Sequence, residues 1–175
     1  MDSKLLSWEA GTRWVRARQK EGRRVVFTNG CFDLLHAGHV HLLQEARRQG
    51  DLLLVGVNSD ESVRRLKGSQ RPLTPLGDRL LVLGALSMVD RLVVFPLDST
   101  SDEVPLPELV DTPWALLRQL CPDILVKGGD YLPEQVVGRE FAGEVHIVPL
   151  LEGRSTTALI RHLKQPSLTA GPTPK

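Results

Sequence analysis

The chain has 175 residues, of which 41% are apolar, and a formal net charge of +1 with acidic and basic residues mixed along its length. A chain of this size can bury one substantial core, so we expect one main domain. The near-neutral charge excludes a general electrostatic attraction to nucleic acid or to a membrane surface. The ligand must therefore be recognised locally.

The sequence carries no sign of export or of a membrane span. Its two cysteines, Cys31 and Cys121, are not part of a C-x-x-C pair, and residues 1–20 lack the apolar core of a signal peptide. No apolar run is long enough to cross a bilayer. We therefore expect a protein of the reducing cytoplasm, with neither nucleic acid nor membrane as a partner.

Strand and helix patterns alternate along the chain. Residues 1–22 are expected to form an N-terminal helical extension. The short apolar runs predict buried strands over 24–29, 51–58, 91–97, 123–129 and 144–150, and the helical periodicities cover 37–49, 76–88, 113–120 and 155–164. Such alternation predicts an α/β fold, a Rossmann-like three-layer sandwich with a mostly parallel five-stranded sheet. Sheets of this kind bind ligands at the carboxyl ends of their strands, at a switch in strand order.

Two segments fall outside this pattern. The proline-rich and acidic stretch 97–110 predicts a surface insertion, and the polar, proline-rich stretch 165–175 predicts a disordered tail. The expected nucleotide-binding domain therefore covers residues 1–164.

The most informative stretch is "TNGCFDLLHAGH", residues 28–39, where the first long strand gives way to a helix. It contains neither a dinucleotide-binding fingerprint nor a P-loop. A helix N-terminus nevertheless offers unpaired N–H groups and the positive end of a dipole, which attract phosphate. His36 and His39 are three residues apart and share one helix face, whereas His41 does not. Gly38 between them leaves the backbone open to an anion. The alternative is that the histidines cap the helix or fill a polar niche.

The same stretch resembles the H-x-G-H motif of the nucleotidyltransferase superfamily. Together with "VGVNSDESVRRLKG", "RPLTP", "PDILVKGGDY" and "EGRSTTALI", it is similar to the adenylyltransferase half of ADP-heptose synthases, from about Arg24 to Leu163. The resemblance implies attack of a sugar 1-phosphate on the α-phosphate of ATP, with Mg²⁺ as the phosphate counter-ion. The products would be an ADP-sugar and pyrophosphate, and relatives suggest a homodimer.

The resemblance also assigns residues to roles. It implies catalytic roles for His36, His39 and Lys127, which would stabilise negative charge on the phosphates. The residues that it implies for binding ATP are Thr28, Asn29, Gly30, Phe32, Gly38, Asn58, Lys67, Arg71, Arg79, Gly128, Gly129, Asp130, Ser155, Thr156 and Thr157. In this comparison "RRLKGSQRP", residues 64–72, is a loop that reaches over the phosphates.

Several of these residues have structural alternatives. Ser155 would serve as an ordinary N-cap, and Lys127 could extend to solvent. Arg79 could pair with Asp78 or with another neighbouring acid. Asp33 fits either a place at the nucleotide site or a structural role in which it binds turn amides.

Two rival functions also fit. A cytidylyltransferase for glycerol 3-phosphate shares the H-x-G-H and S-T-T motifs, although "VKGGDY" and "TNGCFD" favour the adenylyl reading. The second rival is a non-catalytic module that only binds a nucleotide. The presence of both histidines, Lys127 and the S-T-T run argues against it.

Overall fold

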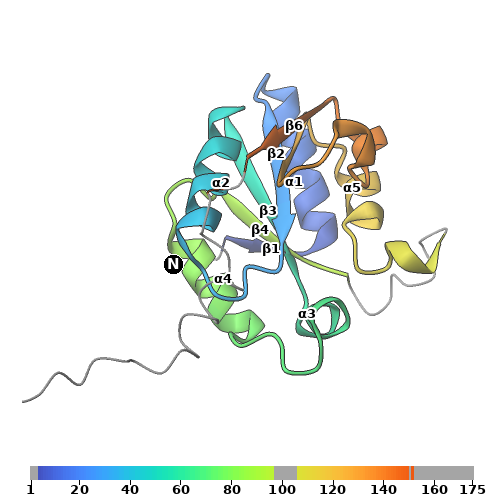
Figure 1. Cartoon of the computed structure of the whole chain (residues 1–175). Coiled ribbons are helices and arrows are strands. Elements are labelled where there is room, and N and C mark those ends of the chain that lie inside the picture. Colours follow the sequence, from blue (N-terminus) through green and yellow to red (C-terminus); the bar gives the residue numbers. More distant parts are fainter. Residues whose placement is uncertain (1–3, 97–105, 150, 152–175) are drawn as a thin grey trace, which may run out of the picture.

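The structure, a computed structural model, describes residues 4–96, 106–149 and 151. Within these residues one parallel sheet has the strand order β1-β4-β3-β2-β5-β6 (Figure 1). Its strands are β1 (Leu5–Leu6), β2 (Val25–Gly30), β3 (Leu52–Asn58), β4 (Arg91–Phe95), β5 (Ile124–Gly128) and β6 (Glu144–Val148). The expected α/β architecture is confirmed, but the described sheet has six strands rather than five. The additional strand, β1, was missed because two residues are too few to establish a periodicity.

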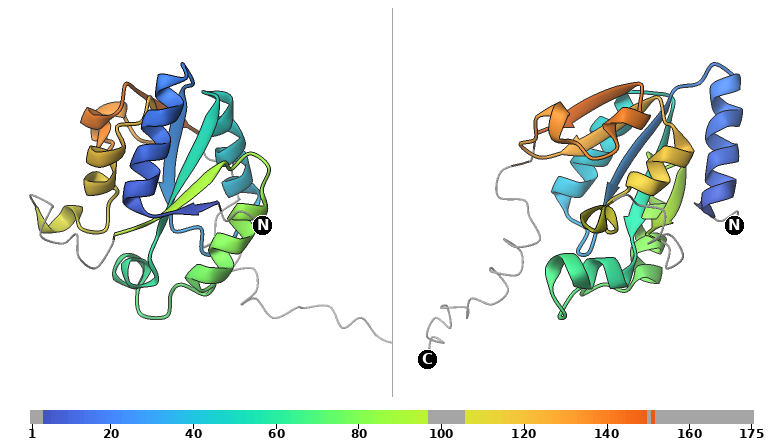
Figure 2. Two further views of the ribbon diagram at one scale, coloured as in Figure 1. Left: turned by 180° about the vertical axis from the view of Figure 1, so that it is seen from behind. Right: turned by 90° about the vertical axis from the view of Figure 1, so that its right-hand side faces the viewer.

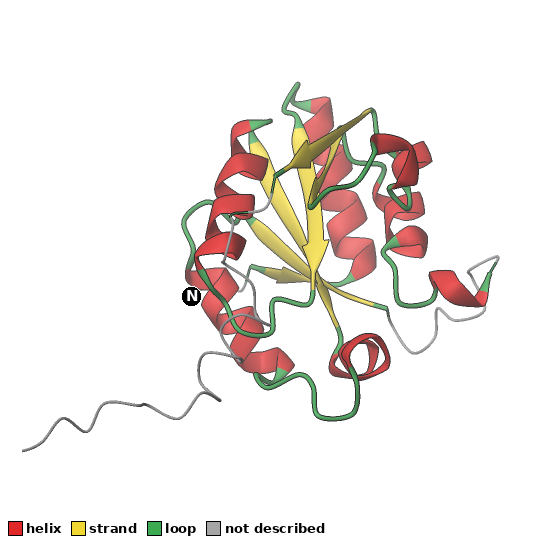
Figure 3. Ribbon diagram, in the orientation of Figure 1, coloured by secondary structure: helices red, strands yellow, loops and turns green. Residues whose placement is uncertain are grey.

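Helices cover both faces of the sheet, as the three-layer prediction requires. On one face, α1 (Trp8–Lys20) and α5 (Trp114–Leu120) pack over Phe27, Leu54 and Val93. On the other, α2 (Ala37–Arg48) and α4 (Leu76–Ala85) enclose the second half of the core. The two layers are seen in Figures 2 and 3. The N-terminal helix is therefore part of the core: Trp8 is buried, and its indole Nε1 donates to the Val94 carbonyl at 2.7 Å.

The helix predictions differ from the structure in two places. The helix expected over 76–88 ends at Ala85, because Leu86 already has extended backbone. The stretch 64–72, expected to be a loop, begins inside α3 (Asp60–Lys67), which Ser59 caps by accepting the Ser62 amide at 3.2 Å. The helix expected over 155–164 lies outside the described residues, as does most of the insertion. In the described part of the chain, short 3₁₀ turns occupy Pro107–Leu109, Pro133–Gln135 and Arg139–Phe141.

Aspartates hold the amino-terminal edge of the sheet. Each of three carboxylates accepts a backbone amide at 2.7 Å, namely Asp51 from Arg24, Asp90 from Leu53 and Asp123 from Val25. These bonds satisfy amides where the strands begin, so their role is structural.

The connections make the strand order reverse beside β2. The chain runs outward from β2 through β3 to β4 and then crosses back to place β5 on the other side of β2. In a parallel sheet this reversal opens a crevice at the carboxyl ends of the two diverging strands. Helix α3 lies beyond the arrowheads of the central strands in Figure 1. The expected ligand position is therefore beside the ends of β2 and β5.

Candidate active site

Side chains from β2 and β5 meet at this crevice. The register pairs Thr28 with Val126, so Asn29 and Lys127 follow on adjacent strands. The Lys127 Nζ donates to Asn29 Oδ1 at 3.3 Å. Burial lowers the pKa of Lys127, and no carboxylate pairs with it among the described residues. Because a buried ammonium group is costly without a counter-charge, an anion at this position would be bound favourably.

The turn after β2 brings the two predicted histidines together. Their ring centroids lie 3.8 Å apart with an interplanar angle of 24°, so the imidazoles stack. Phe32, which is buried, lies on the other side of His39 at 5.3 Å between centroids. His36 is also the N-cap of α2, because its Nδ1 accepts the Gly38 amide at 3.1 Å. The capping alternative is thus realised for His36, and it leaves the other ring nitrogen for a ligand.

Both imidazoles are held in the neutral form near pH 7. Burial lowers the pKa of His36. Burial, together with the stacked His36, lowers the pKa of His39 to about 4, while the Leu34 backbone and Asp33 act in the opposite direction. A neutral imidazole carries one N–H. Since Nδ1 of His36 accepts a hydrogen bond, its proton must be on Nε2, which makes Nε2 a donor.

A buried hydroxyl lies in β2 just before the turn. Thr28 is fully buried, and its Oγ1 has no hydrogen-bond partner among the described residues. Buried hydroxyl groups are normally paired, so an unpaired one at the crevice fits contact with a ligand.

The glycines at the end of β5 and just after it allow the backbone and neighbouring side chains to approach closely. Gly129 has a φ of +136°, a conformation that other residues rarely adopt, and its amide donates to the Val148 carbonyl at 3.0 Å. A Cβ at this position would lie 2.7 Å from the Tyr131 ring. Gly128 ends β5, whereas Asp130 is exposed. At the end of β2, Gly30 contacts the Phe32 ring in the same way, since a Cβ there would lie 3.2 Å from it.

The side chain of Asn58, at the end of β3, is hydrogen-bonded to other residues of the protein. Its Nδ2 donates to Ser62 Oγ at 2.9 Å and to the Asp111 carbonyl at 3.1 Å. Asp111 also pairs with Arg65 of α3 through both carboxylate oxygens, at 2.7 to 3.1 Å. Asn58 therefore ties the start of α3 to the segment that follows the insertion, and whether it also contacts ATP stays a prediction.

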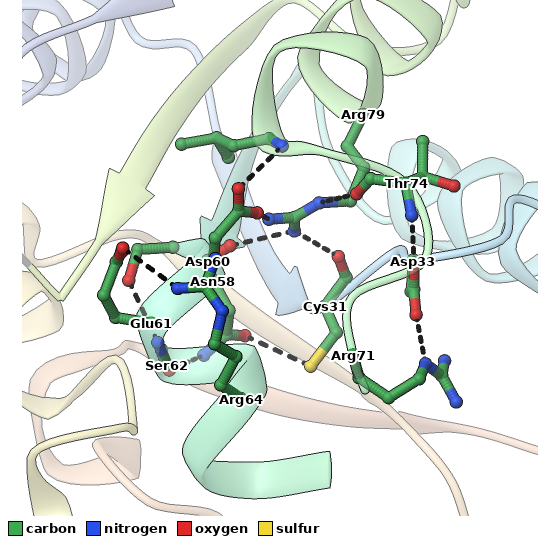
Figure 4. A network of polar contacts seen from close by, with 12 residues as sticks. Cys31, Asp33, Asn58, Asp60, Glu61, Ser62, Arg64, Arg71, Thr74 and Arg79 are labelled. Carbon is green, nitrogen blue, oxygen red and sulfur yellow. Dashed lines mark hydrogen bonds and ion pairs between the residues drawn. The ribbon is translucent and has the colours of Figure 1, made fainter. Parts of the chain in front are cut away.

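Arg79 lies at the centre of a second group of contacts (Figure 4). Its side chain is fully buried, and the guanidinium donates to the carbonyls of Cys31, Asn58 and Thr74 at 2.5 to 3.1 Å. Its ion-pair partner is Asp60 at 2.7 Å, not the adjacent Asp78. These contacts join the carboxyl ends of β2 and β3 to the loop before α4, which is the structural role left open by the sequence.

Asp33 takes the structural alternative as well. Its buried carboxylate accepts the amides of Leu73 and Thr74 at 2.7 and 2.8 Å through one oxygen. The other oxygen accepts from Nε of Arg71. Arg71 is thereby brought next to the turn that precedes α2, and its contact with ATP stays a prediction.

The remaining predicted residues are not assembled at the crevice by described contacts. Lys67 is exposed at the end of α3. Ser155, Thr156 and Thr157 lie outside the described residues. Sequence reasoning missed Asp60 and Asp111, because their partners are 19 and 46 residues away and no local pattern signals such pairing.

No group of three or more metal-ligating side chains of the histidine, cysteine or acidic type occurs in the described part of the chain. These residues therefore do not offer a resident metal site, and Mg²⁺ stays a prediction as a counter-ion carried by ATP. Within the same residues, no helix is both long and apolar enough to span a membrane.

Residues 27–164 match the cytidylyltransferase-like family. Among curated proteins, the chain is 48% identical to bifunctional protein HldE of Geotalea uraniireducens over 171 residues, which are 95% of this chain and 32% of that protein. It is 50% identical to HldE of Halorhodospira halophila over 86% of this chain and 30% of that protein. The chain thus spans about a third of the length of the curated relatives that it matches.

Two solved structures resemble the fold. A lipopolysaccharide core biosynthesis protein from Thermoplasma volcanium is 25% identical, with a TM-score of 0.52 over 74% of this chain and 98% of that chain. Pantoate-beta-alanine ligase from Francisella tularensis, solved with an ATP analogue and beta-alanine, is 18% identical with a TM-score of 0.56, over 83% of this chain and 66% of that one. The second likeness concerns the fold alone.

Proposed function

Because the chain belongs to the cytidylyltransferase-like family of nucleotidyltransferases, we propose that it transfers AMP from ATP to a sugar 1-phosphate, with heptose 1-phosphate as the acceptor. The products are an ADP-sugar and pyrophosphate. The observation that carries the proposal is the pair of stacked, neutral imidazoles at the N-terminus of α2, beside the switch in strand order.

In the proposed reaction an oxygen of the sugar phosphate bonds to the α-phosphorus of ATP. The bond from that phosphorus to the α,β-bridging oxygen breaks, and pyrophosphate leaves with the electron pair. The acceptor supplies the nucleophile, so the protein needs no nucleophilic side chain. Its task is to position both substrates and to stabilise negative charge as it redistributes over the phosphates.

The crevice residues suit this task. Neutral His36 and His39 each have one N–H to donate, and the N-terminus of α2 adds the positive end of a helix dipole. Lys127 supplies a positive charge from β5 on the opposite side of the crevice. The unpaired hydroxyl of Thr28 is a further donor. Mg²⁺ would accompany ATP and neutralise part of the triphosphate charge.

The HldE relatives and the Thermoplasma volcanium protein support a place in heptose and lipopolysaccharide chemistry. The substrates of this chain are nevertheless a proposal, because the match covers only about a third of the HldE proteins. The family description, cytidylyltransferase-like, also fits the rival function of a cytidylyltransferase, for which glycerol 3-phosphate is the acceptor to test.

Pyrophosphate release separates these functions. ATP, CTP, GTP and UTP are each incubated with Mg²⁺ and either heptose 1-phosphate, glucose 1-phosphate or glycerol 3-phosphate. We expect the highest kcat/KM with ATP and heptose 1-phosphate, and poor use of CTP. Equal or better use of CTP would overturn the adenylyl assignment. ATP binding without pyrophosphate release from any pair would indicate the non-catalytic module.

A further inference from the structure

Asp33 is a buried negative charge beside a site that is to bind phosphates. Its side chain is 2% exposed, and it is close enough to His39 to act on the pKa of that ring. A bare carboxylate there would repel an anionic substrate. It is compensated by Arg71, whose Nε donates to Asp33 Oδ2.

The geometry of this pair leaves one edge of the guanidinium available. Figure 4 shows the terminal nitrogens of Arg71 on the side away from Asp33. The described residues supply no partner for these two nitrogens, and the Arg71 side chain is 19% exposed. A guanidinium presents its donors in a rigid plane, so fixing Nε on a carboxylate also fixes the direction of the opposite edge.

The loop that carries Arg71 is fixed by the same network. Asp33 Oδ1 accepts the amides of Leu73 and Thr74, while Arg79, a residue of α4, donates to the Thr74 carbonyl. Thr74 is therefore held through both its amide and its carbonyl. The backbone at residues 73–74 is anchored to the H-x-G-H turn, and Arg71 is anchored through its own side chain.

We propose that Asp33 is a positioning residue that orients Arg71 so that the outer edge of its guanidinium binds a substrate phosphate group. This inference rests on the proposed function for the identity of the substrates, but it concerns a contact within the protein. Asp33 does not touch the phosphate. It acts through Arg71, and the pairing in turn compensates the Asp33 carboxylate, which would otherwise repel the anion.

A purely structural role for Asp33 predicts a different pattern. If Asp33 only accepted the two loop amides, its loss would weaken the fold, and its effect on substrate binding would not depend on Arg71. If it positions Arg71, its loss must no longer weaken phosphate binding once Arg71 has been removed. A double-mutant cycle distinguishes these cases.

The experiment compares Asp33→Asn, Arg71→Ala and the double variant. Asp33→Asn is nearly isosteric and retains an oxygen for the loop amides, but its amide NH₂ cannot accept from Arg71. The matched control is Asp123→Asn, which removes a carboxylate that accepts one amide at 2.7 Å at the opposite edge of the sheet. Kd for Mg·ATP and for inorganic phosphate is measured by calorimetry, KM for each substrate by pyrophosphate release, and folding by urea unfolding.

We expect Arg71→Ala to weaken phosphate binding by about 10- to 100-fold, the size of a lost hydrogen bond to a charged group. Asp33→Asn should weaken binding of the same substrate by roughly 3- to 10-fold. In the Arg71→Ala background it should cause no further loss, because the carboxylate that it removes is then unpaired and repels the anion. Asp123→Asn should leave every Kd and KM unchanged. Additive effects of Asp33→Asn and Arg71→Ala, or an effect of Asp33→Asn on a different substrate, would overturn the inference.

Failure of the proposed function is distinguishable from failure of this inference. If the wild type binds Mg·ATP but converts no sugar phosphate, the proposed reaction is wrong, while the cycle measured on ATP binding still tests Asp33. If Arg71→Ala alters neither Mg·ATP nor phosphate binding nor any KM, the positioning role is wrong even in an active enzyme.

Discussion

At the scale of single residues, His36 shows how one side chain serves both fold and chemistry. Its Nδ1 caps α2, and this hydrogen bond determines which nitrogen carries the proton. Capping and phosphate binding are usually weighed as alternatives for a histidine at a helix start. Here the first selects the tautomer that the second requires.

His39 is expected to act mainly in the transition state. Removing one preorganised donor to developing negative charge costs roughly 3–4 kcal/mol, or about 10²–10³ in kcat. His39→Ala should therefore slow pyrophosphate release by that factor while Kd for ATP changes much less, since the other donors hold the ground-state triphosphate. The matched control is His41→Ala on the same helix, which should retain near-normal kcat. A folded His39→Ala protein with near-normal kcat would leave His39 a packing residue.

His39 also makes stability depend on pH. Its pKa is about 4 in the folded protein and 6.5 ordinarily, so the unfolded chain binds the extra proton first as the pH falls. The contribution of His39 to the free energy of unfolding is fully present above about pH 6.5. It is lost as the pH falls towards 4, which lowers the free energy of unfolding by up to about 3 kcal/mol. Urea unfolding measures the free energy of unfolding of wild type and His39→Gln between pH 7 and 4. Plots of this free energy against pH should differ in slope between about pH 6.5 and 4. Equal slopes, or an NMR titration of His39 near 6.5, would contradict the assignment.

At the scale of elements, Arg79 joins segments that the backbone alone would leave separate. It binds the ends of β2 and β3, the start of α3 through Asp60, and the loop before α4. These segments therefore share one buried cation, and its removal would leave their carbonyls and the Asp60 carboxylate without this donor.

Arg79→Met is expected to lower the free energy of unfolding by about 3–5 kcal/mol, because it breaks a buried pair and leaves acceptors without donors. The control is Arg64→Met. Arg64 pairs with Glu61 at 3.2 Å on the exposed side of α3, so its loss should cost less than about 1 kcal/mol. Urea denaturation of the three proteins provides the comparison. Similar losses for both variants would mean that Arg79 is not a structural centre.

At the scale of the whole molecule, the parts that could be predicted are those with a strong local signal. The run 52–58 is apolar on both faces of the strand, which only a covered parallel strand explains, and the helical period from Ala37 to Arg48 follows a recognisable motif. Helix α3 gave no such signal, because "DESVRRLK" is mostly polar and its buried residues are only Ser62 and Val63.

The site was predictable to a similar extent. The places of the H-x-G-H turn after β2 and of Lys127 in β5 could be predicted, since their residue types are unusual where the sequence puts them, and their catalytic roles stay predictions. The roles of Asp33 and Arg79 could not be decided, because each depends on partners 19 to 48 residues away. Which of two acids pairs with a buried arginine is a property of the folded chain.

The crossover from β4 to β5 also determines when the crevice beside β2 is completed during synthesis. Strands β2, β3 and β4 follow one another along the chain, but the second neighbour of β2 is β5, which begins about 99 residues after β2 begins. As the chain emerges from the ribosome, the edge of β2 that pairs with β5 stays open until residues 124–128 have been made. Open edges invite pairing with other chains. The strand that completes the crevice beside β2 is thus also expected to protect the nascent protein from aggregation.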